Sequence, residues 1–384
     1  MSRLHVLHVA GDFPNQHAYI ELVSHLDRLG VAQEIYAAVR TAAEAAWPPP
    51  ALTGARFYTP RLLRPYHRLL FRSKIRRIQR SLERDVPVHT VTVTHAHSIY
   101  SDGAVAHRLW QARGMPYLVA VRNGDIHAFM RYRPDLVGLR NAVLRAAGRV
   151  VFLSPAYWPT LLEALDPALR AAVEAKALVV PNGVAPEWLA WTPPRRRAPS
   201  PDTPLRILYV GDFSANKNVP ALIAAVGYLC GTRPARLTLV GGGGDAQGAV
   251  ANLLRGQAAS WVTWVGRIND RAALRDQYRA HDIFAMPSIT ESFGLAYTEA
   301  MSQGLPVVHS HGQGVAGLFR PDTVAEPVDP RDPEAIAAGL ACLAARCERV
   351  REECVAEATR FNWERIAGTY VTLYEALGRT TGEA

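Results

Sequence analysis

Short apolar runs alternate with amphipathic segments along most of the chain. Residues 4–9 form an apolar run typical of a buried strand, and residues 18–29 follow with helical periodicity that ends at Gly30. The same alternation restarts at residues 205–210 and continues to Val308. Strands that alternate with helices at this spacing predict parallel sheets with helices on both faces, a doubly wound α/β architecture.

Further segments fit the same alternation. In the first half we expect strands at residues 32–39, 90–94, 116–121 and 150–153, and helices at residues 101–114 and 155–165. In the second half, residues 283–286 predict a short buried strand, and residues 361–377 predict a last helix. Residues 295–302 predict another helix, which Gly304 and Pro306 end.

A proline-rich polar segment divides the chain. Residues 191–204 contain five prolines, and such a segment packs as neither helix nor strand. With 384 residues the chain is also long enough for two domains. We therefore predict a first domain over residues 1–183, a linker over residues 184–204 and a second domain over residues 205–363.

The composition is that of an ordinary globular protein, with 49% hydrophobic and 20% charged residues. No uncharged apolar run reaches the 18 or so residues of a membrane-spanning helix, and the first residues lack the regions of a signal peptide. We therefore expect a cytoplasmic protein. The cysteines show no C-x-x-C spacing and predict free thiols. They are Cys230, Cys342, Cys347 and Cys354.

The net charge of +9 is concentrated in residues 61–84, where nine Arg or Lys residues face one acid, Glu83. Arginines recur at every fourth position from Arg64 to Arg84, so a helix would carry them on one slowly drifting face. Such a helix either lies on an anionic membrane, where each basic residue contributes about 1 kcal/mol of binding free energy, or packs on the core with its arginines in solvent. Both interpretations stay open, and the first predicts peripheral contact with the inner membrane face. Nucleic acid is not expected as a partner, because no binding module is recognisable.

The most informative side chains lie in residues 287–308. Glu291 and Glu299 are eight positions apart, one in a polar loop and one on the expected helix. Gly294, between them, lets the backbone approach a ligand closely, and the free N–H groups of the helix start suit a phosphate. Two carboxylates beside a phosphate site make sense when each accepts hydrogen bonds from hydroxyl groups. The arrangement fits a protein that binds a nucleotide sugar.

This stretch resembles the E-x7-E motif of the retaining family-4 glycosyltransferases, which have the GT-B fold of two facing Rossmann-like domains. Other segments resemble parts of the same family in the same order, and the resemblance is specific over residues 179–310. They are the hinge at 179–184, the strand–Gly–loop–Lys segment at 208–218, and two further glycine turns at 237–245 and 262–267. The last helix resembles the family's terminal helix, so residues 364–384 are expected to complete the first domain.

The resemblance implies a donor site in the second domain. Glu299 is expected to bind the ribose hydroxyls, Glu291 to approach the donor sugar, and Lys217 to stabilise the phosphates, with Glu291 and Lys217 catalytic. The family often has Arg directly after the glycine, where this chain has Asp212, so Arg267 or Arg122 is expected to compensate. The full implied donor set is Gly211, Asp212, Lys217, Gly266, Arg267, Ile268, Glu291, Phe293, Gly294, Leu295, Glu299 and Arg122.

The first domain is expected to bind the acceptor. The residues assigned to it are Asn15, His17, His97 and Asp125, and Asp125 is a catalytic candidate that orients the acceptor hydroxyl. His95 and His97 resemble a metal pair, but no third ligand has convincing spacing, and a hydrogen-bonded histidine at a strand end is the favoured interpretation for at least one of them. No metal site and no cofactor are therefore expected.

The sequence thus predicts a metal-independent, retaining glycosyltransferase. It contains no Asp-x-Asp motif for a metal, and the implied same-face reaction uses the leaving phosphate to deprotonate the acceptor. The donor partner is a nucleoside-diphosphate sugar, and the acceptor is a glycan, a lipid-linked sugar or a small metabolite. Alternatives stay open: a GT-B-like epimerase or phosphorylase, a non-catalytic sugar- or lipid-binding protein, and a dinucleotide oxidoreductase. The last rests on residues 241–246, which satisfy G-x-G-x-x-A.

Overall fold

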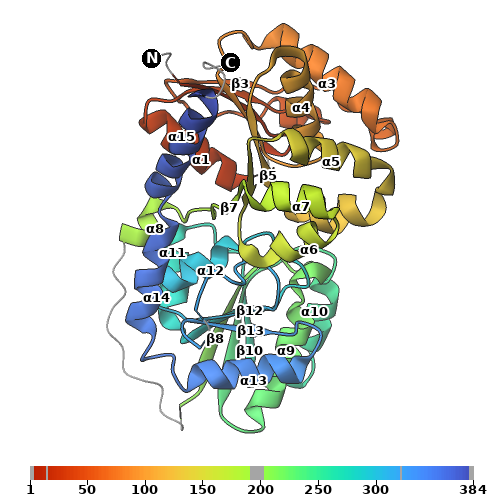
Figure 1. The fold of residues 1–384 in the computed structure, drawn as a ribbon. Coiled ribbons are helices and arrows are strands. Elements are labelled where there is room, and N and C mark those ends of the chain that lie inside the picture. The colour runs from red at the N-terminus through yellow and green to blue at the C-terminus, as the bar shows by residue number, and fades with distance from the viewer. Residues whose placement is uncertain (1–3, 14–15, 191–202, 321, 380–384) are drawn as a thin grey trace. The chain divides into compact units, whose positions relative to one another are not determined.

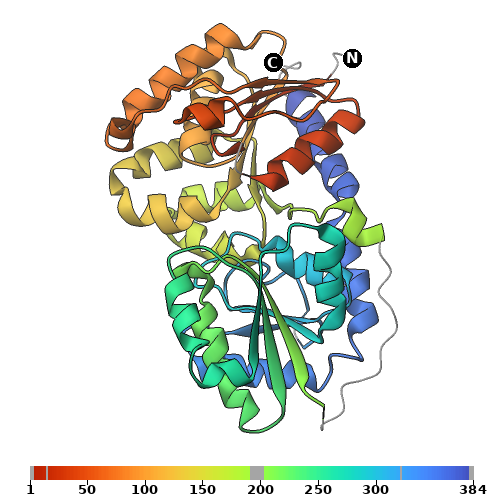
Figure 2. The same cartoon turned by 180° about the vertical axis from the view of Figure 1, so that it is seen from behind.

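Two parallel sheets organise the chain in the computed structural model, which describes residues 4–13, 16–190, 203–320 and 322–379. Each sheet is the centre of one unit, with helices on both of its faces (Figures 1 and 2). The first unit comprises Met1–Leu153, Tyr157–Gly183 and Trp363–Ala384, and the second comprises Ser154–Ala156 and Val184–Asn362. The predicted fold class, parallel α/β with two Rossmann-like units, is confirmed.

The first sheet has the strand order β3-β2-β1-β4-β5-β6-β7, and all its neighbouring strands are parallel. The chain adds strands outward in one direction from β1 and then in the other from β4, so the order reverses between these two strands. The strands are β1 (His5–Val9), β2 (Ala32–Tyr36), β3 (Ala55–Tyr58), β4 (Val93–Ala96), β5 (Tyr117–Val121), β6 (Arg149–Phe152) and β7 (Ala177–Val179).

Helices cover both faces of this sheet. They are α1 (His17–Arg28), α2 (Ala42–Ala45), α3 (Phe71–Asp85), α4 (Ser101–Arg113), α5 (Val137–Ala146), α6 (Trp158–Glu163), α7 (Pro167–Glu174) and α15 (Trp363–Arg379). Short helical turns lie at η2 (Pro65–Arg68), η3 (Asp125–Met130), η4 (Pro134–Leu136) and η5 (Pro155–Tyr157). Although α1 and α15 are far apart in sequence, they pack side by side on the same face of the sheet (Figure 1).

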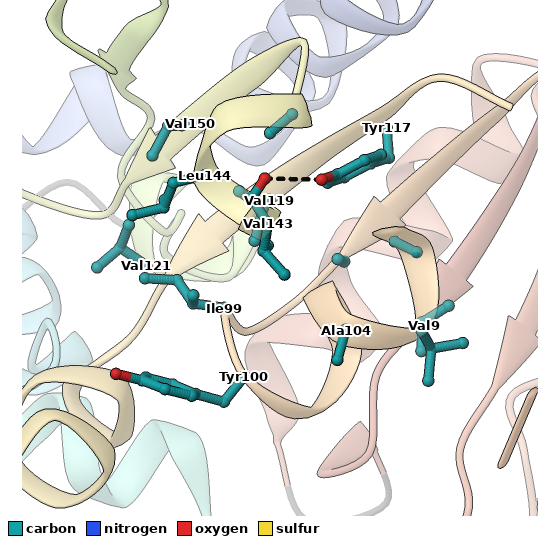
Figure 3. Close-up of a cluster of buried hydrophobic side chains, with 14 of the residues drawn as sticks. Val9, Ile99, Tyr100, Ala104, Tyr117, Val119, Val121, Val143, Leu144 and Val150 are labelled. Carbon is teal, nitrogen blue, oxygen red and sulfur yellow. Dashed lines mark hydrogen bonds between the residues drawn. The ribbon is translucent and has the colours of Figure 1, made fainter. Parts of the chain in front are cut away.

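The strands of the first sheet carry apolar side chains on both faces, as expected for a parallel sheet, and these side chains form the core of the first unit. On one face, Val119 and Val121 of β5 pack with Val143 and Leu144 of α5 (Figure 3). The buried hydroxyl of Tyr117 donates a hydrogen bond to the backbone oxygen of Val143 at 2.7 Å, so this polar group is satisfied within the core. The opposite face packs against α1 and α15.

The second sheet has the strand order β10-β9-β8-β11-β12-β13, again with every neighbouring pair parallel. Its strands are β8 (Leu205–Gly211), β9 (Ala235–Gly241), β10 (Val262–Gly266), β11 (Ile283–Met286), β12 (Val307–Ser310) and β13 (Ala325–Val328). Its helices are α8 (Pro186–Ala190), α9 (Val219–Cys230), α10 (Gln247–Leu253), α11 (Arg271–Ala280), α12 (Leu295–Ser302), α13 (Pro333–Ala344) and α14 (Arg351–Ala358), with turns η6 (Ala215–Lys217), η7 (Gln257–Ser260) and η8 (Thr359–Phe361). The order reverses between β8 and β11.

The strand predicted at 283–286 and the helix predicted at 295–302 match β11 and α12 residue for residue. The strand expected at 90–94 is instead β4, shifted toward the C-terminus. The reason is local, because the Thr90 backbone N–H and hydroxyl both donate to Pro87 O and hold a turn there. Most of the expected linker, residues 191–202, lies outside the described residues.

The basic segment 61–84 is not one continuous helix. The turn η2 begins at Pro65, and α3 begins only at Phe71, so Arg64 and Arg68 precede the helix. Arg72, Arg76, Arg80 and Arg84 are exposed on α3. None of the described helices is long and apolar enough to cross a membrane. The four cysteines are free thiols, as predicted.

Candidate functional site

The carboxyl ends of β8 and β11 carry the candidate site of the second unit. These strands are neighbours and lie where the strand order reverses. Loops that leave parallel strands at such a reversal diverge to opposite faces and leave room for a ligand. Lys217 follows β8 in the turn η6, and Glu291 follows β11, so the fold brings together two residues that are 74 positions apart.

Lys217 and Glu291 form an ion pair. Lys217 Nζ lies 2.6 Å from Glu291 Oε2, and the two side chains are 20% and 11% exposed. The Ser288 hydroxyl donates to the same oxygen at 3.4 Å, while Glu291 Oε1 accepts from the Ser292 N–H at 3.1 Å. A charged pair that is mostly shielded but still reachable by solvent suits a site that exchanges one partner for a charged ligand.

Asn216 hydrogen-bonds the loop after β8, which carries Lys217, to the loop after β11, which carries Glu291. Its Nδ2 donates to Thr290 O at 2.7 Å, and its Oδ1 accepts from the Thr290 N–H at 3.0 Å and from the Thr290 hydroxyl at 2.7 Å. The backbone adds a bond from Ile289 N to Asn216 O at 2.8 Å. The residues next to the ion pair are therefore fixed on both sides. Sequence reasoning missed Asn216, because its partner Thr290 is identifiable only once β8 and β11 are neighbours.

Glu299 lies on α12 and is held by a tyrosine that the sequence did not single out. The Tyr278 hydroxyl, from α11, donates to Glu299 Oε2 at 3.0 Å. Burial and the adjacent carboxylate raise the pKa of Tyr278 well above its usual value, so it stays a hydrogen-bond donor. Such a half-buried, oriented carboxylate can accept hydroxyl donors from a ligand.

The start of α12 presents backbone donors next to Glu291. Gly294, at the helix start, has a φ of 81°, and a Cβ there would meet the Tyr297 ring at 2.5 Å, so only glycine fits. The backbone N–H groups of Phe293, Gly294 and Leu295 donate to no other described residue. The Phe293 side chain is buried against Phe361, so only its backbone is offered. Such a helix start attracts anions through its free N–H groups and its dipole.

Glycines lie in the turns at the ends of β8, β9 and β10, in the same unit as Lys217 and Glu291. Gly211 ends β8, and a Cβ on Gly241, which has a φ of 128°, would lie only 1.8 Å from Gly211 O. Gly266 ends β10 with a φ of 86°, and Arg267 Nη2 donates to Gly242 O at 3.0 Å. These glycines are needed so that the turns can pack against each other. The same packing accounts for the run at 241–246, which follows β9 and not the first strand of its unit, without a dinucleotide site.

Asp212 occupies the place where the resembled family often has Arg. Its Oδ1 accepts from the Ser214 N–H at 2.8 Å and stabilises the turn before η6. Burial opposes its ionisation, but the Ser214 hydrogen bonds and the charges of Lys217 and Arg267 outweigh burial, and the Asp212 pKa falls below its usual value. Asp212 is therefore anionic and contributes to the turn. Arg267 is exposed and Ile268 is half-buried directly after β10.

In the first unit, Asp125 holds backbone groups. It is 2% exposed, and its carboxylate accepts from the N–H groups of Ile99 at 3.1 Å, Tyr100 at 3.4 Å and Arg122 at 2.9 Å. Burial raises the pKa of Asp125 to about 6, and these hydrogen bonds oppose the rise. The predicted catalytic role is not favoured, because both oxygens are already engaged in fixing the loops after β4 and β5.

The other residues assigned to the acceptor side are scattered. His17 is exposed at the start of α1, with Nε2 3.2 Å from Glu21 Oε1, and Asn15 lies outside the described residues. Arg122, which was expected in the donor set, belongs to the first unit, where it is half-buried, donates to His97 O at 3.1 Å and lies 5.1 Å over the Tyr19 ring. His97 is buried in the core, which makes it a poor acceptor contact.

The expectation that His95 and His97 have no third partner is wrong. His8 of β1 joins them, and its Nδ1 lies 3.0 Å from His97 Nε2. The third histidine was hidden because it lies 87 positions before His95 and becomes its neighbour only through the pairing of β1 with β4. The preference for a hydrogen-bonded strand histidine holds for His95, whose Nδ1 lies 2.8 Å from the Tyr374 hydroxyl.

Comparison with known proteins agrees with this geometry. Residues 204–346 match a family model described as "Glycosyl transferases group 1". Among curated relatives, a D-inositol 3-phosphate glycosyltransferase of Segniliparus rotundus is 34% identical over 179 residues, which cover 44% of this chain and 39% of that protein. This chain aligns with only about half, or less, of the length of the curated relatives it matches.

Solved structures match over nearly the whole chain. A sucrose-phosphate synthase of Thermosynechococcus elongatus has a TM-score of 0.75 at 21% identity, covering 98% of this chain and 100% of that one. The Anabaena protein HepE, solved in complex with UDP, has a TM-score of 0.70 at 16% identity, covering 98% and 100%. At such low identity the likeness shows the fold, which is that of the GT-B glycosyltransferases.

Proposed function

We propose that the protein transfers a sugar from a nucleoside-diphosphate sugar to an acceptor hydroxyl, because residues 204–346 match the group 1 glycosyl transferase model and the chain has the GT-B fold. The reaction proceeds with retention at the anomeric carbon and without a metal ion. The observation that carries the proposal is the ion pair between Lys217 and Glu291 at the reversal between β8 and β11, next to the free N–H groups of α12. The Anabaena protein HepE, of similar fold, is solved in complex with UDP, which supports a nucleotide donor.

The donor diphosphate replaces Glu291 as the ion-pair partner of Lys217. When the bond between the anomeric carbon and the phosphate oxygen breaks, its electron pair stays on the diphosphate. Lys217 and the N–H groups of Phe293, Gly294 and Leu295 stabilise that charge, which is the work a metal does in other transferases. The acceptor oxygen bonds to the same face of the sugar, and its proton passes to the departing phosphate.

The two glutamates bind the neutral parts of the donor. Glu291, released from Lys217, accepts hydrogen bonds from sugar hydroxyls, and Glu299 accepts them from the ribose. Tyr278 donates to Glu299 Oε2 and so gives the carboxylate a defined orientation. Charge-assisted hydrogen bonds of this kind are worth about 1.5–3 kcal/mol each.

A thermal-shift screen with nucleoside diphosphates and their sugars, in EDTA, tests the donor site. A selective rise in melting temperature that disappears in Glu299→Ala supports it and names the base. A response to NAD(H) and to no nucleoside diphosphate contradicts the proposal. Transfer itself requires that nucleotide release depend on an added acceptor and that NMR show the donor's anomeric configuration in the product. These readouts also separate transfer from epimerisation, phosphorolysis and binding alone.

We also propose that residues 61–84 contact an anionic membrane surface, which favours a lipid-linked acceptor. Leu69 and Leu70, between η2 and α3, are 83% and 57% exposed, and exposed arginines of α3 follow them. Apolar tips beside basic residues fit the interfacial region of a bilayer. Replacing Arg68, Arg72 and Arg76 by Glu is expected to abolish sedimentation with phosphatidylglycerol vesicles. Unchanged sedimentation contradicts this contact, and neutral phosphatidylcholine vesicles are the control.

A further inference from the structure

Three histidines meet inside the first unit, away from the site assigned to the donor. His8 lies on β1, His95 lies on β4 opposite it in the strand register, and His97 follows two residues later. Residues two apart on a strand share a face of the sheet, so the three rings lie on the same face. One nitrogen of each ring lies within 4.8 Å of the others. On this face the rings pack beside Tyr370 and Tyr374 of α15.

The cluster is fully buried and incompletely hydrogen-bonded. His8, His95 and His97 are 0%, 0% and 1% exposed. Nε2 of His8, Nε2 of His95 and Nδ1 of His97 have no hydrogen-bond partner in the described part of the chain. Buried polar atoms almost always have a partner, because an unmade bond costs about 1–3 kcal/mol. Of these three atoms, Nε2 of His95 is therefore available to a ligand shared with the other two rings.

The electrostatic environment keeps these rings in the form that binds metals. Burial lowers the pKa of His8 to about 3, while burial, the neighbouring histidines and Arg122 hold the pKa of His95 and His97 well below their usual value. The rings are therefore neutral at physiological pH and carry lone pairs. Metal ligation requires this deprotonated state.

We propose that His8, His95 and His97 form a structural binding site for a divalent transition-metal ion of the zinc class. Imidazole nitrogen suits zinc, copper, iron and nickel, whereas magnesium and calcium prefer oxygen. Two nitrogens bound to one tetrahedral zinc ion at about 2.0–2.1 Å lie about 3.4 Å apart. His8 Nδ1 and His97 Nε2 are 3.0 Å apart, close to that separation, and an ion bound beside the line that joins them would replace their hydrogen bond.

The third ligand and the outer contacts fit the same ion. The Nδ1 of His95 lies 2.8 Å from the Tyr374 hydroxyl, which leaves its Nε2 for the metal. The His95 ring stacks on that of His97, with centroids 3.9 Å apart and planes 15° apart, so the His95 ring must turn out of this stack before its Nε2 can point at the same ion. Gln33 interacts with His8, and its Oε1 has no hydrogen-bond partner among the residues described. This oxygen either accepts from the outer nitrogen of His8 or completes the coordination, as outer-shell groups do at metal sites.

The ion would connect three distant parts of the first unit. It would join β1 to β4 directly and reach α15 through Tyr374. The backbone immediately after His97 supplies the N–H groups of Ile99 and Tyr100 that Asp125 binds. Its role is structural, because the donor residues Lys217 and Glu291 belong to the other unit. The inference is therefore independent of the metal-free reaction proposed above.

The full chain, purified without a polyhistidine tag, tests the site. Mass spectrometry for metals is expected to find about one zinc ion per chain after gel filtration. Cobalt added to chelator-treated protein is expected to give the intense visible bands of a four-coordinate ion, and X-ray absorption to show imidazole scattering. Less than a tenth of an equivalent of retained metal, together with no cobalt bands, overturns the proposal without recourse to any variant.

Variants then assign the ligands. His8→Gln and His97→Gln are expected to weaken metal binding at least 10-fold and to remove the zinc-dependent rise in melting temperature. His107→Gln is the matched control, because His107 is also buried in the first unit but stacks on Trp110 outside the cluster. Equal metal binding in His8→Gln and in the wild type overturns the assignment. Should the variants not fold, the wild-type cobalt spectrum and X-ray absorption decide.

Discussion

The two sheets reverse their strand order at corresponding places, between β1 and β4 in the first unit and between β8 and β11 in the second. The side chains near the two reversals differ in kind. In the second unit, Lys217 and Glu291 form a partly exposed ion pair beside free backbone donors. In the first, neutral histidines and the carboxylate of Asp125 are buried and bind parts of the protein itself. The same topology thus leaves a charged pair partly exposed in one unit and buries polar side chains in the other.

The largest effect is expected from Lys217→Ala, which removes the cation at the second reversal. Loss of one preorganised electrostatic group typically costs about 10²–10³-fold in turnover. Stability is expected to change little, because Lys217 is paired in a site that solvent reaches. Steady-state kinetics and a melting curve measure both. Lys176→Ala is the control, since the Lys176 side chain donates to Arg145 O in the first unit. Turnover within a factor of about three of wild type would contradict the functional role proposed for Lys217 in the second unit.

Asp125→Asn tests whether Asp125 stabilises the first unit by accepting hydrogen bonds from its backbone. An amide presents one acceptor oxygen and an N–H₂ group to the three backbone donors, so a stability loss of about 1–3 kcal/mol is expected. Chemical denaturation measures it. Asp135→Asn is the control, because Asp135 is exposed and paired with Arg133. A variant as stable as wild type but without turnover would return Asp125 to a catalytic role.

The effect of Asp125→Asn on stability is expected to depend on pH. The folded pKa of Asp125 is raised to about 6, above the ordinary value of about 3.9, so the folded state binds the proton more tightly. Its contribution to stability is therefore full below about pH 4 and is lost as pH rises through 6. The difference in melting temperature between wild type and Asp125→Asn is expected to shrink over that interval. A difference that stays constant from pH 4 to 7 would place the Asp125 pKa near its ordinary value.

Asn216→Ala probes how firmly the ion pair is positioned. The Thr290 N–H and hydroxyl lose their shared acceptor, so the loop that carries Glu291 gains freedom relative to Lys217. We expect a fall in kcat of roughly 10-fold, equivalent to about 1.4 kcal/mol, with a melting temperature lowered by a few degrees. Asn252→Ala on α10 is the control. A change in KM alone would show that Asn216 affects binding but not the placement of the pair.

The smallest effect is expected from Tyr278→Phe, which leaves Glu299 in place but removes its hydroxyl partner. A lost hydrogen bond to a charged group is worth about 1.5–3 kcal/mol before solvent replaces it. Since Glu299 is only half-buried, we expect a rise in nucleotide Kd of roughly 5-fold, with kcat unchanged. Calorimetry checks this, and in Glu299→Ala the tyrosine change is expected to have no further effect. Additive losses would show that Tyr278 acts through another residue.

The sequence predicted the second unit in more detail than the first, for a physical reason. Around Glu291 the strand, the glycine start and the helix are consecutive in the chain, so their boundaries follow from local patterns. The partners Asn216–Thr290 and Tyr278–Glu299 depend on which strands and helices become neighbours, and no local pattern contains that information. The same limitation hid His8, and it hid Ile99 and Tyr100, the partners of Asp125 that follow β4.

One contact also constrains the order in which the chain folds. The hydrogen bond between His95 and Tyr374 spans 279 residues, and the apolar face of the first sheet, including Val6 and Leu118, packs against Ile366 and Leu377 of α15. During synthesis, α1 alone of these two helices can cover that sheet face until α15 has left the ribosome. The second unit, nearly continuous between Val184 and Asn362, has all its parts earlier. It can therefore complete its fold before the first unit does, which reverses the usual N-terminal-first order.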